Sequence, residues 1–349
     1  VPKEHCAALI ARIKVMSRLN IAEKRLPQDG KCKLKVRGKK LELRVATVPT
    51  VQGESAVLHI LAAGAAMPLE KLNMHPNNHK RVVELSAHPH GLFLVVGPTG
   101  SGKTTTLHAV LGYINKPERK IWTAEDPVEI TQPGLQQVQM LPKIDFTFAT
   151  AMRAFLRADP DVILIGEMRD HETASIGVEA SLTGHLVLST LHTNSAPETI
   201  TRLLDLGLDP VNFSDALLGV LAQRLMRTLC SKCKEPYKPD QKELDHLMDN
   251  YGRELFEKDM AEFDLSKLEL MRAVGCEECG DTGYKGRTGI HELLVGTHEL
   301  QAMIYKKAEL DDIRAQALKD GMRTMKQDGI HKILNGFTDY QQLLRVVAE

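Results

Sequence analysis

The sequence lacks an excess of charge of either sign, because its 349 residues carry 45 lysines and arginines against 45 aspartates and glutamates. With a single tryptophan as well, this balance gives no support to a nucleic-acid partner, although a local basic face remains compatible with it. Long apolar runs are also missing. The best runs, Gly91–Val96 and Ala216–Ala222, fall far short of the ~20 residues that span a bilayer, so we expect the chain itself to be soluble.

The beginning of the chain has neither an initiator methionine nor an apolar signal segment. It starts at Val1, and we therefore expect a piece of a longer protein whose upstream part is not represented. The length predicts two or three domains, and the 43% apolar content is typical of a globular protein.

One motif dominates the middle of the chain. The run Gly97-Pro-Thr-Gly-Ser-Gly-Lys103-Thr104 follows an apolar stretch that ends at Val96, and it is a complete phosphate-binding loop. Its glycines let backbone N–H groups face phosphates, Lys103 reaches the β- and γ-phosphates of ATP, and Thr104 is a ligand for Mg²⁺. The predicted nucleotide-binding residues are Gly97, Pro98, Thr99, Gly100, Ser101, Gly102, Lys103, Thr104 and Thr105.

Two acidic motifs follow at the ends of predicted strands. The apolar segment Asp161–Ile165 delivers Glu167 to the carboxyl edge of the sheet, where a carboxylate holds Mg²⁺. The segment Glu125-Asp-Pro-Val-Glu129 follows a strand that we expect to end at Thr123, and such an acidic turn is suited to orienting a water molecule. Taken alone, either motif is also compatible with solvated surface carboxylates.

Two histidines bracket a further apolar strand. His185 in Thr183-Gly-His185 and His192 in Leu191-His-Thr-Asn194 lie at opposite ends of it, so they cannot form one metal pair. Each is compatible with a structural hydrogen bond or with sensing a phosphate near the nucleotide.

Four of the six cysteines occur as two C-x-x-C pairs, Cys230/Cys233 and Cys276/Cys279. Four thiolates in this pattern predict a closed structural Zn²⁺ site, the alternative being a redox dithiol. Cys6 and Cys32 have no partner at ligand spacing, and we expect them to be ordinary buried residues.

The order of elements predicts an α/β fold. Strands are expected at Lys31–Arg37 and Lys40–Val48, after a helix, and then at Leu92–Val96, Lys120–Thr123, Asp161–Ile165 and His185–Thr190 in alternation with helices. Ser195 is predicted to cap a helix, and Thr338-x-x-Gln341 to form a capping box.

The order of these motifs along the chain resembles that of the type II secretion and type IV pilus assembly ATPases, the GspE/PilB family. The motifs are the phosphate loop, the Glu-Asp-Pro-Val-Glu turn, the Gly-Glu strand, the two histidine segments and the tetracysteine module. The resemblance covers essentially the whole chain. It implies a PAS-like α+β N-terminal domain, present in part, and a RecA-like core. The implied divisions are 1–63 for the partial PAS-like domain, 64–76 for a linker, 77–228 for the RecA-like core, 229–285 for the zinc module and 286–349 for a helical C-terminal region.

The resemblance also implies roles for residues. Glu129 would be the catalytic glutamate, Glu167 would act through Mg²⁺, and His185 and His192 would couple the phosphate state to neighbouring subunits. Arg44 matches one of two arginines that close over the phosphates in this family, whereas the second position holds His59. A neutral imidazole offers one donor where arginine offers a charged fork, so we expect weaker or pH-dependent closure.

The function implied by the resemblance is Mg²⁺-dependent ATP hydrolysis by a homohexameric motor. Such a motor is cytoplasmic, lies at the inner membrane through a platform protein and drives pilin or pseudopilin assembly. The tetracysteine module favours assembly and export members over retraction motors. Two alternatives stay open, a non-hydrolysing nucleotide-gated scaffold and a RecA-like nucleic-acid translocase.

Overall fold

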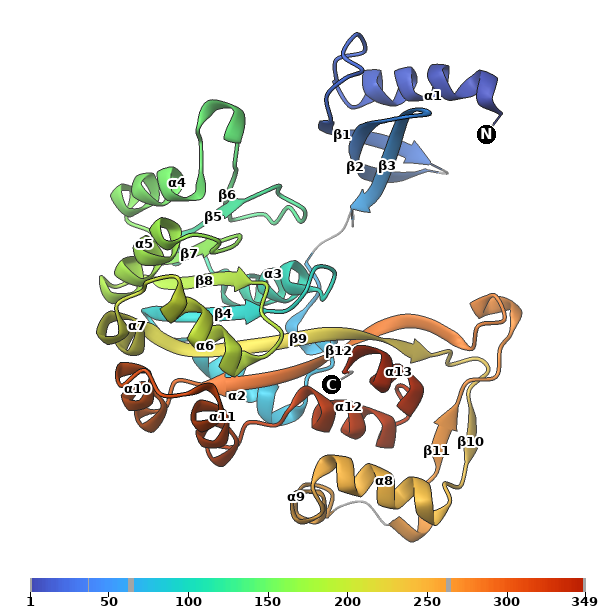
Figure 1. Ribbon diagram of the computed structural model, residues 1–349, viewed down its shortest axis with the longest axis vertical. Helices are drawn as coiled ribbons and strands as arrows, with labels where there is room; N and C mark the ends of the chain where they lie inside the picture. The colour runs from blue at the N-terminus through green and yellow to red at the C-terminus, as the bar shows by residue number, and fades with distance from the viewer. Residues whose placement is uncertain (1, 37, 62–65, 262–264, 348–349) are drawn as a thin grey trace. The chain divides into compact units, whose positions relative to one another are not determined.

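The computed structural model describes residues 2–36, 38–61, 66–261 and 265–347 (Figure 1). These residues divide into two compact units. The first contains the described residues up to Ala66 together with Glu129–Gln132, and the second contains the rest. Among the residues predicted to form the linker, 64 and 65 lie outside the described residues, as does Arg37 at the end of a predicted strand.

The N-terminal unit packs one helix on a three-stranded antiparallel sheet. Helix α1 covers Lys3–Met16, and the strands β1 (Gln28–Val36), β2 (Lys39–Thr50) and β3 (Gly53–Leu61) lie in the order β1-β2-β3. Cys32, Leu43 and Val45 form its small buried core. The helix and the first two strands were predicted from the sequence, although β1 begins three residues earlier than expected.

The second unit is built on a seven-stranded sheet in the order β12-β9-β4-β8-β7-β5-β6. Neighbouring strands from β9 to β6 run parallel, and β12 is antiparallel to β9. The strands are β4 (Gly91–Val96), β5 (Ile121–Glu125), β6 (Gln136–Gln139), β7 (Val162–Ile165), β8 (Leu186–Leu191), β9 (Leu217–Leu229) and β12 (Tyr284–Val295). The α/β class predicted from the sequence is confirmed.

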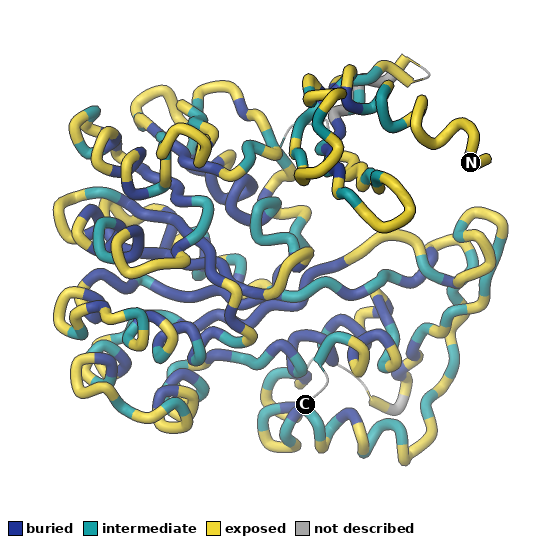
Figure 2. Tube along the Cα trace, turned by 45° about the horizontal axis from the view of Figure 1, so that its top comes forward, coloured by how far each residue is buried: buried dark blue, intermediate teal, exposed yellow. Residues whose placement is uncertain are grey.

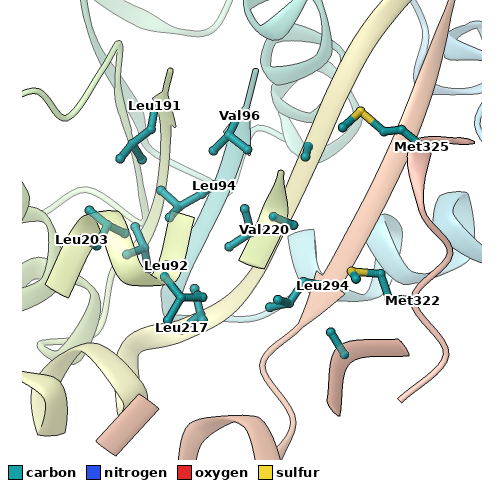
Figure 3. Close-up of a cluster of buried hydrophobic side chains, with 14 of the residues drawn as sticks. Leu92, Leu94, Val96, Leu191, Leu203, Leu217, Val220, Leu294, Met322 and Met325 are labelled. Atoms are coloured by element: carbon teal, nitrogen blue, oxygen red, sulfur yellow. The ribbon is translucent and has the colours of Figure 1, made fainter. Parts of the chain in front are cut away.

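Helices cover both faces of this sheet because its central strands are apolar on both sides. In β4, Leu92, Leu94 and Val96 belong to one buried cluster and Phe93 and Val95 to another. Figure 3 shows the first cluster, and Figure 2 shows the central strands as buried tube. The helices are α2 (Pro76–Ser86), α3 (Lys103–Ile114), α4 (Phe148–Phe155), α5 (His171–Leu182), α6 (Ala196–Asp205), α7 (Pro210–Ala216), α10 (His298–Tyr305), α11 (Leu310–Lys319), α12 (Met325–Leu334) and α13 (Tyr340–Val346).

The long strands β9 and β12 form a ribbon that extends from the sheet to a smaller two-stranded sheet, as Figure 1 shows. This smaller sheet pairs β10 (Glu235–Tyr237) with β11 (Leu270–Arg272), and the helices α8 (Gln241–Tyr251) and α9 (Arg253–Asp259) lie between them in the chain. The predicted helical C-terminal region therefore begins with a strand, because residues 286–295 belong to β12.

Four short 3₁₀ helices of the second unit lie in the connections: η1 (Leu69–Leu72), η2 (Pro142–Ile144), η3 (Leu156–Ala158) and η4 (Leu265–Lys267). A fifth, η5 (Glu277–Cys279), contains Cys279, the second cysteine of the pair Cys276/Cys279. The first corrects the predicted linker, because Leu69 is buried in the core of the second unit and η1 therefore belongs to that unit.

The helix caps follow the sequence with one correction. Ser195 caps α6 as predicted, since its side chain accepts a hydrogen bond from the Glu198 amide. The predicted capping box at Thr338 is wrong by one residue. Asp339 caps α13 and accepts from the Gln342 amide, while the Thr338 hydroxyl donates to the Arg227 carbonyl over 2.9 Å.

Candidate functional site

The phosphate loop connects the buried strand β4 to helix α3, as the motif predicts. Gly97, Gly100 and Gly102 adopt φ angles of +147°, +81° and +89°, a region that side chains with a Cβ disfavour. At Gly97 a Cβ would also lie 2.4 Å from the Gln223 carbonyl oxygen, so the neighbouring strand β9 excludes any larger residue. The loop thus brings its backbone and the first turn of α3 together in the geometry that binds phosphates.

Lys103 begins α3 and folds back over the loop. Its Nζ lies 2.7 Å from the Gly97 carbonyl oxygen and 3.1 Å from that of Pro98. Burial lowers the pKa of Lys103, and the negative charge of Glu167 opposes this shift. The Lys103 amine therefore lies at the mouth of the loop, within electrostatic reach of the acidic residue that the sequence assigned to Mg²⁺.

Glu167 stands just beyond strand β7, whose four residues are all buried. Its carboxylate is 12% exposed and receives two cationic or polar neighbours. The Arg169 guanidinium lies 2.5 Å from Oε1, and Nε2 of His192 lies 3.4 Å from Oε2. Because His192 follows the adjacent strand β8, the carboxyl ends of two parallel strands meet here.

His185 lies at the other end of β8, as the sequence predicted. Its Nδ1 is 2.9 Å from the Ala180 carbonyl oxygen at the end of α5. The structure therefore brings His192, but not His185, to Glu167.

The acidic motif needs a correction at its first residue. Strand β5 runs to Glu125, which is 4% exposed and is not part of a solvated turn. The Glu125 carboxylate lies 3.1 Å from Nε2 of the buried His108 and accepts hydrogen bonds from the Thr123 hydroxyl and the Gln137 amide. Burial raises the pKa of Glu125, but these partners outweigh it and the net pKa is lowered. Glu125 is thus a buried structural carboxylate, whereas Glu129 at the end of the motif is exposed.

Arg44 and His59 are cross-strand partners on β2 and β3 of the N-terminal unit. Paired residues of antiparallel strands project to the same face, so the two side chains are neighbours on one face of this sheet. The Arg44 guanidinium also lies 3.7 Å from the Asp29 carboxylate, where the Arg44 side chain is half-buried and the Asp29 side chain is exposed.

A cavity of about 570 Å³ opens beside the phosphate loop. Its walls combine apolar side chains with polar groups from the loop, β9, β12 and the segment before α2. The residues that matter below are Leu72, Asn73, Thr105, Gln223, Leu225 and Phe337. This cavity could not be predicted from the sequence, because its walls come from five segments, the fifth being the connection that holds Phe337, and no local pattern links them.

The four predicted zinc ligands come together. Their ligand atoms all lie within 4.8 Å of one another, and the Sγ–Sγ distances of the pairs 230/276, 233/279 and 276/279 are 3.9, 3.9 and 3.7 Å. Four sulfurs placed 2.3 Å from a tetrahedral Zn²⁺ lie ~3.8 Å apart, so the arrangement fits the ion. Two backbone amides, those of Cys276 and Gly283, also donate to the Cys279 sulfur over 3.2 Å. Cys32 is buried as expected, whereas Cys6 is exposed and corrects that prediction.

Within the described ranges, every helix is too short or too polar to cross a membrane.

Comparison with known proteins gives one consistent picture. The family model described as "Type II/IV secretion system protein" matches residues 2–345. The chain is 46% identical over 346 residues to the Type II secretion system ATPase E of Vibrio cholerae, covering 98% of this chain and 65% of that protein. It is 45% identical over 350 residues to the Type IV pilus assembly ATPase PilB of Thermus thermophilus, covering 100% of this chain and 38% of that protein.

Among solved structures, the pilus retraction motor PilT with bound ADP is similar at a TM-score of 0.65 and 27% identity, over 93% of this chain and 78% of that one. The chain spans about two thirds of the Vibrio protein's length and less of the Thermus protein's.

Proposed function

Because the chain belongs to the Type II/IV secretion system protein family, we propose that it is a Mg²⁺-dependent ATPase that powers the assembly of pilins or pseudopilins. The observation that carries this proposal is that the phosphate loop, which includes Lys103, and Glu167 follow parallel strands at the same carboxyl edge of one sheet. Phosphoryl transfer needs positioning and charge neutralisation more than covalent chemistry, and these residues supply both.

Each residue has a proposed task at the phosphates. The N–H groups of the loop and the Lys103 amine bind the β- and γ-phosphates, and Thr104 and Glu167 hold Mg²⁺. The bound cation supplies charge that stabilises the transferring phosphoryl group. The His192 imidazole orients Glu167 through the 3.4 Å contact, and Glu129 accepts a proton from the attacking water as general base. Arg44 neutralises phosphate charge when the N-terminal unit closes over the nucleotide.

We propose that the cavity beside the loop takes the base and ribose of the nucleotide. Thr105 lies one residue beyond the loop and lines the cavity, so a nucleotide with phosphates in the loop places its nucleoside there. Leu72, Leu225 and Phe337 offer apolar contacts to a base, and Asn73 offers hydrogen bonds.

The larger assembly follows from the family. We propose a homohexameric ring in the cytoplasm, held at the inner membrane by a platform protein, with the PAS-like unit and the RecA-like core opening and closing during turnover. The cysteine cluster holds Zn²⁺ in this proposal and stabilises the module that extends from β9. His185, at the far end of β8, is proposed to couple subunits rather than to contact Glu167.

Steady-state ATP hydrolysis in the presence of Mg²⁺ tests the proposal. We expect the Glu129→Gln variant to keep its fold and its nucleotide binding, and its turnover to fall by ~10²-fold or more. Glu118→Gln is the matched control, since Glu118 is an exposed glutamate between α3 and β5. If the wild-type protein binds ATP but turns it over no faster than Glu129→Gln, the motor proposal fails and the nucleotide-gated scaffold is favoured. Salt-dependent DNA binding would instead favour a translocase.

A further inference from the structure

Gln223 is a buried amide on strand β9, directly after the apolar run Leu217–Ala222. It is 2% exposed, and its neighbour Ala222 pairs with Val96, the last residue of β4. Gln223 therefore lies directly beside the point where the chain leaves β4 and enters the phosphate loop. None of the motifs in the sequence includes it.

Both the side chain and the backbone of Gln223 face this loop. Its Nε2 donates a hydrogen bond of 2.7 Å to the Ser101 carbonyl oxygen. A Cβ at Gly102 would lie 3.2 Å from the same Nε2, and a Cβ at Gly97 would lie 2.4 Å from the Gln223 carbonyl oxygen. Gln223 thus contacts the loop at its beginning and at its end.

Only one end of the Gln223 side-chain amide has a hydrogen-bond partner. Within the described part of the chain, Gln223 Oε1 and the nearby Ser101 hydroxyl are buried without a hydrogen-bond partner. An unpaired buried polar atom lowers stability, so a leucine of similar volume would serve better if the position were only part of the core. The contact that distinguishes glutamine from leucine here is the bond to Ser101.

We propose that Gln223 is a positioning residue for phosphate binding. A trans peptide group points its C=O and the following N–H in opposite directions. Holding the Ser101 carbonyl on the β9 side therefore turns the Gly102 N–H away from β9 and toward the phosphates. The inference rests on the proposed nucleotide binding, and it assigns to β9 the alignment of one donor of the loop.

The test compares two fluorescent probes, N-methylanthraniloyl-ADP and the same fluorophore on adenosine, on the whole chain. Gln223→Leu is expected to weaken ADP binding about tenfold and adenosine binding by a clearly smaller factor, because Gln223 also lines the cavity proposed for the nucleoside. Gln327→Leu is the matched control, because the buried Gln327 also donates to a backbone carbonyl, that of Tyr251, over 2.7 Å but lies away from the loop. Its ADP and adenosine affinities are both expected to stay at the wild-type level.

Gln223→Met provides a second variant of similar length that has no donor for Ser101 and adds no charge, and it is used if Gln223→Leu fails to fold. Equal loss of both affinities, or no loss of either, would overturn the positioning role. Wild-type protein that binds neither probe would instead reject the proposed function itself, so the two failures are distinct.

Discussion

The imidazole of His192 lies 3.4 Å from the carboxylate of Glu167, although the two residues follow different strands of the sheet. Parallel strands β7 and β8 end at the same edge, and this shared edge sets the contact. Because His192 contacts the proposed Mg²⁺ ligand Glu167, replacing it is expected to change how this carboxylate is oriented.

Replacing His192 tests this contact. We expect His192→Ala to lower ATP turnover by roughly 10- to 100-fold, the usual cost of losing an outer partner of a metal ligand, with little change in nucleotide affinity. Turnover and nucleotide Kd are measured together, with His88→Ala as a control on an exposed loop histidine. A parallel loss in affinity would show that His192 contributes to binding and not to the orientation of Glu167.

A second experiment concerns the face of the N-terminal sheet where Arg44 and His59 are cross-strand partners. Arginine at position 59 would place a second guanidinium beside Arg44, and we expect His59→Arg to raise ATP turnover about tenfold at neutral pH. Ser55→Arg adds the same charge to the same strand and controls for general electrostatic attraction. If His59→Arg does not raise turnover at any pH from 6 to 8, the hypothesis that His59 makes a weaker phosphate contact than arginine is wrong.

The cysteine cluster predicts a measurable metal. We expect about one Zn²⁺ per chain by elemental analysis, and its loss, with a marked fall in thermal stability, in Cys233→Ser. Cys6→Ser is the control, because Cys6 is an exposed cysteine of the N-terminal unit. Wild-type protein without bound metal, together with full stability of Cys233→Ser, would show that the cluster consists of four unliganded thiols.

The stability of the fold should depend on pH through a pair of histidines. The rings of His75 and His331 lie 4.6 Å apart at their centroids. Burial, followed by the nearby positive charge of His75, lowers the pKa of His331 to about 4, with Asp328 opposing this shift. In the unfolded chain the His331 imidazole binds a proton near pH 6.5. Its contribution to the free energy of unfolding is therefore fully present above that pH and is lost as the pH falls toward 4.

We expect the effect of His331 to reach roughly 2 kcal/mol after discounting for solvent screening, and the pH dependence to be reduced but not abolished in His331→Phe, because burial also lowers the pKa of His75 and of His291. Urea unfolding at pH 7, 6 and 5 measures it, and His298→Phe, on an exposed position of α10, is the control. A wild-type protein as stable at pH 5 as at pH 7 would contradict the assignment.

Much of the α/β unit could be predicted from short signals. The strands that precede the phosphate loop and Glu167 are continuous apolar runs, which predict buried strands. Ser195 is followed by a proline and a glutamate, and this pattern predicts the beginning of a helix. The cysteine spacing likewise predicted a cluster that the structure brings together.

Other features escaped the sequence for physical reasons. Strand β9 contains Leu, Gln, Arg and Met, which favour helices by themselves, and it becomes a strand because it pairs with β4 and β12. Glu125 was read as part of a solvated turn because its partner His108 lies on another element. The cap at Asp339 was missed by one residue since Thr338 offers an equally good local pattern.

Strand β9 has a mechanical consequence. Gln223 contacts the phosphate loop from it, and Cys230 follows its last residue, so about 23 Å of extended backbone separate the two. Hydrogen bonds to β12 along most of this length stiffen it into a rod. The pairing shifts register once, between Tyr284 and Arg287 near the cysteine end. A partner that binds the cysteine module would therefore act on the same strand that contacts the phosphate loop.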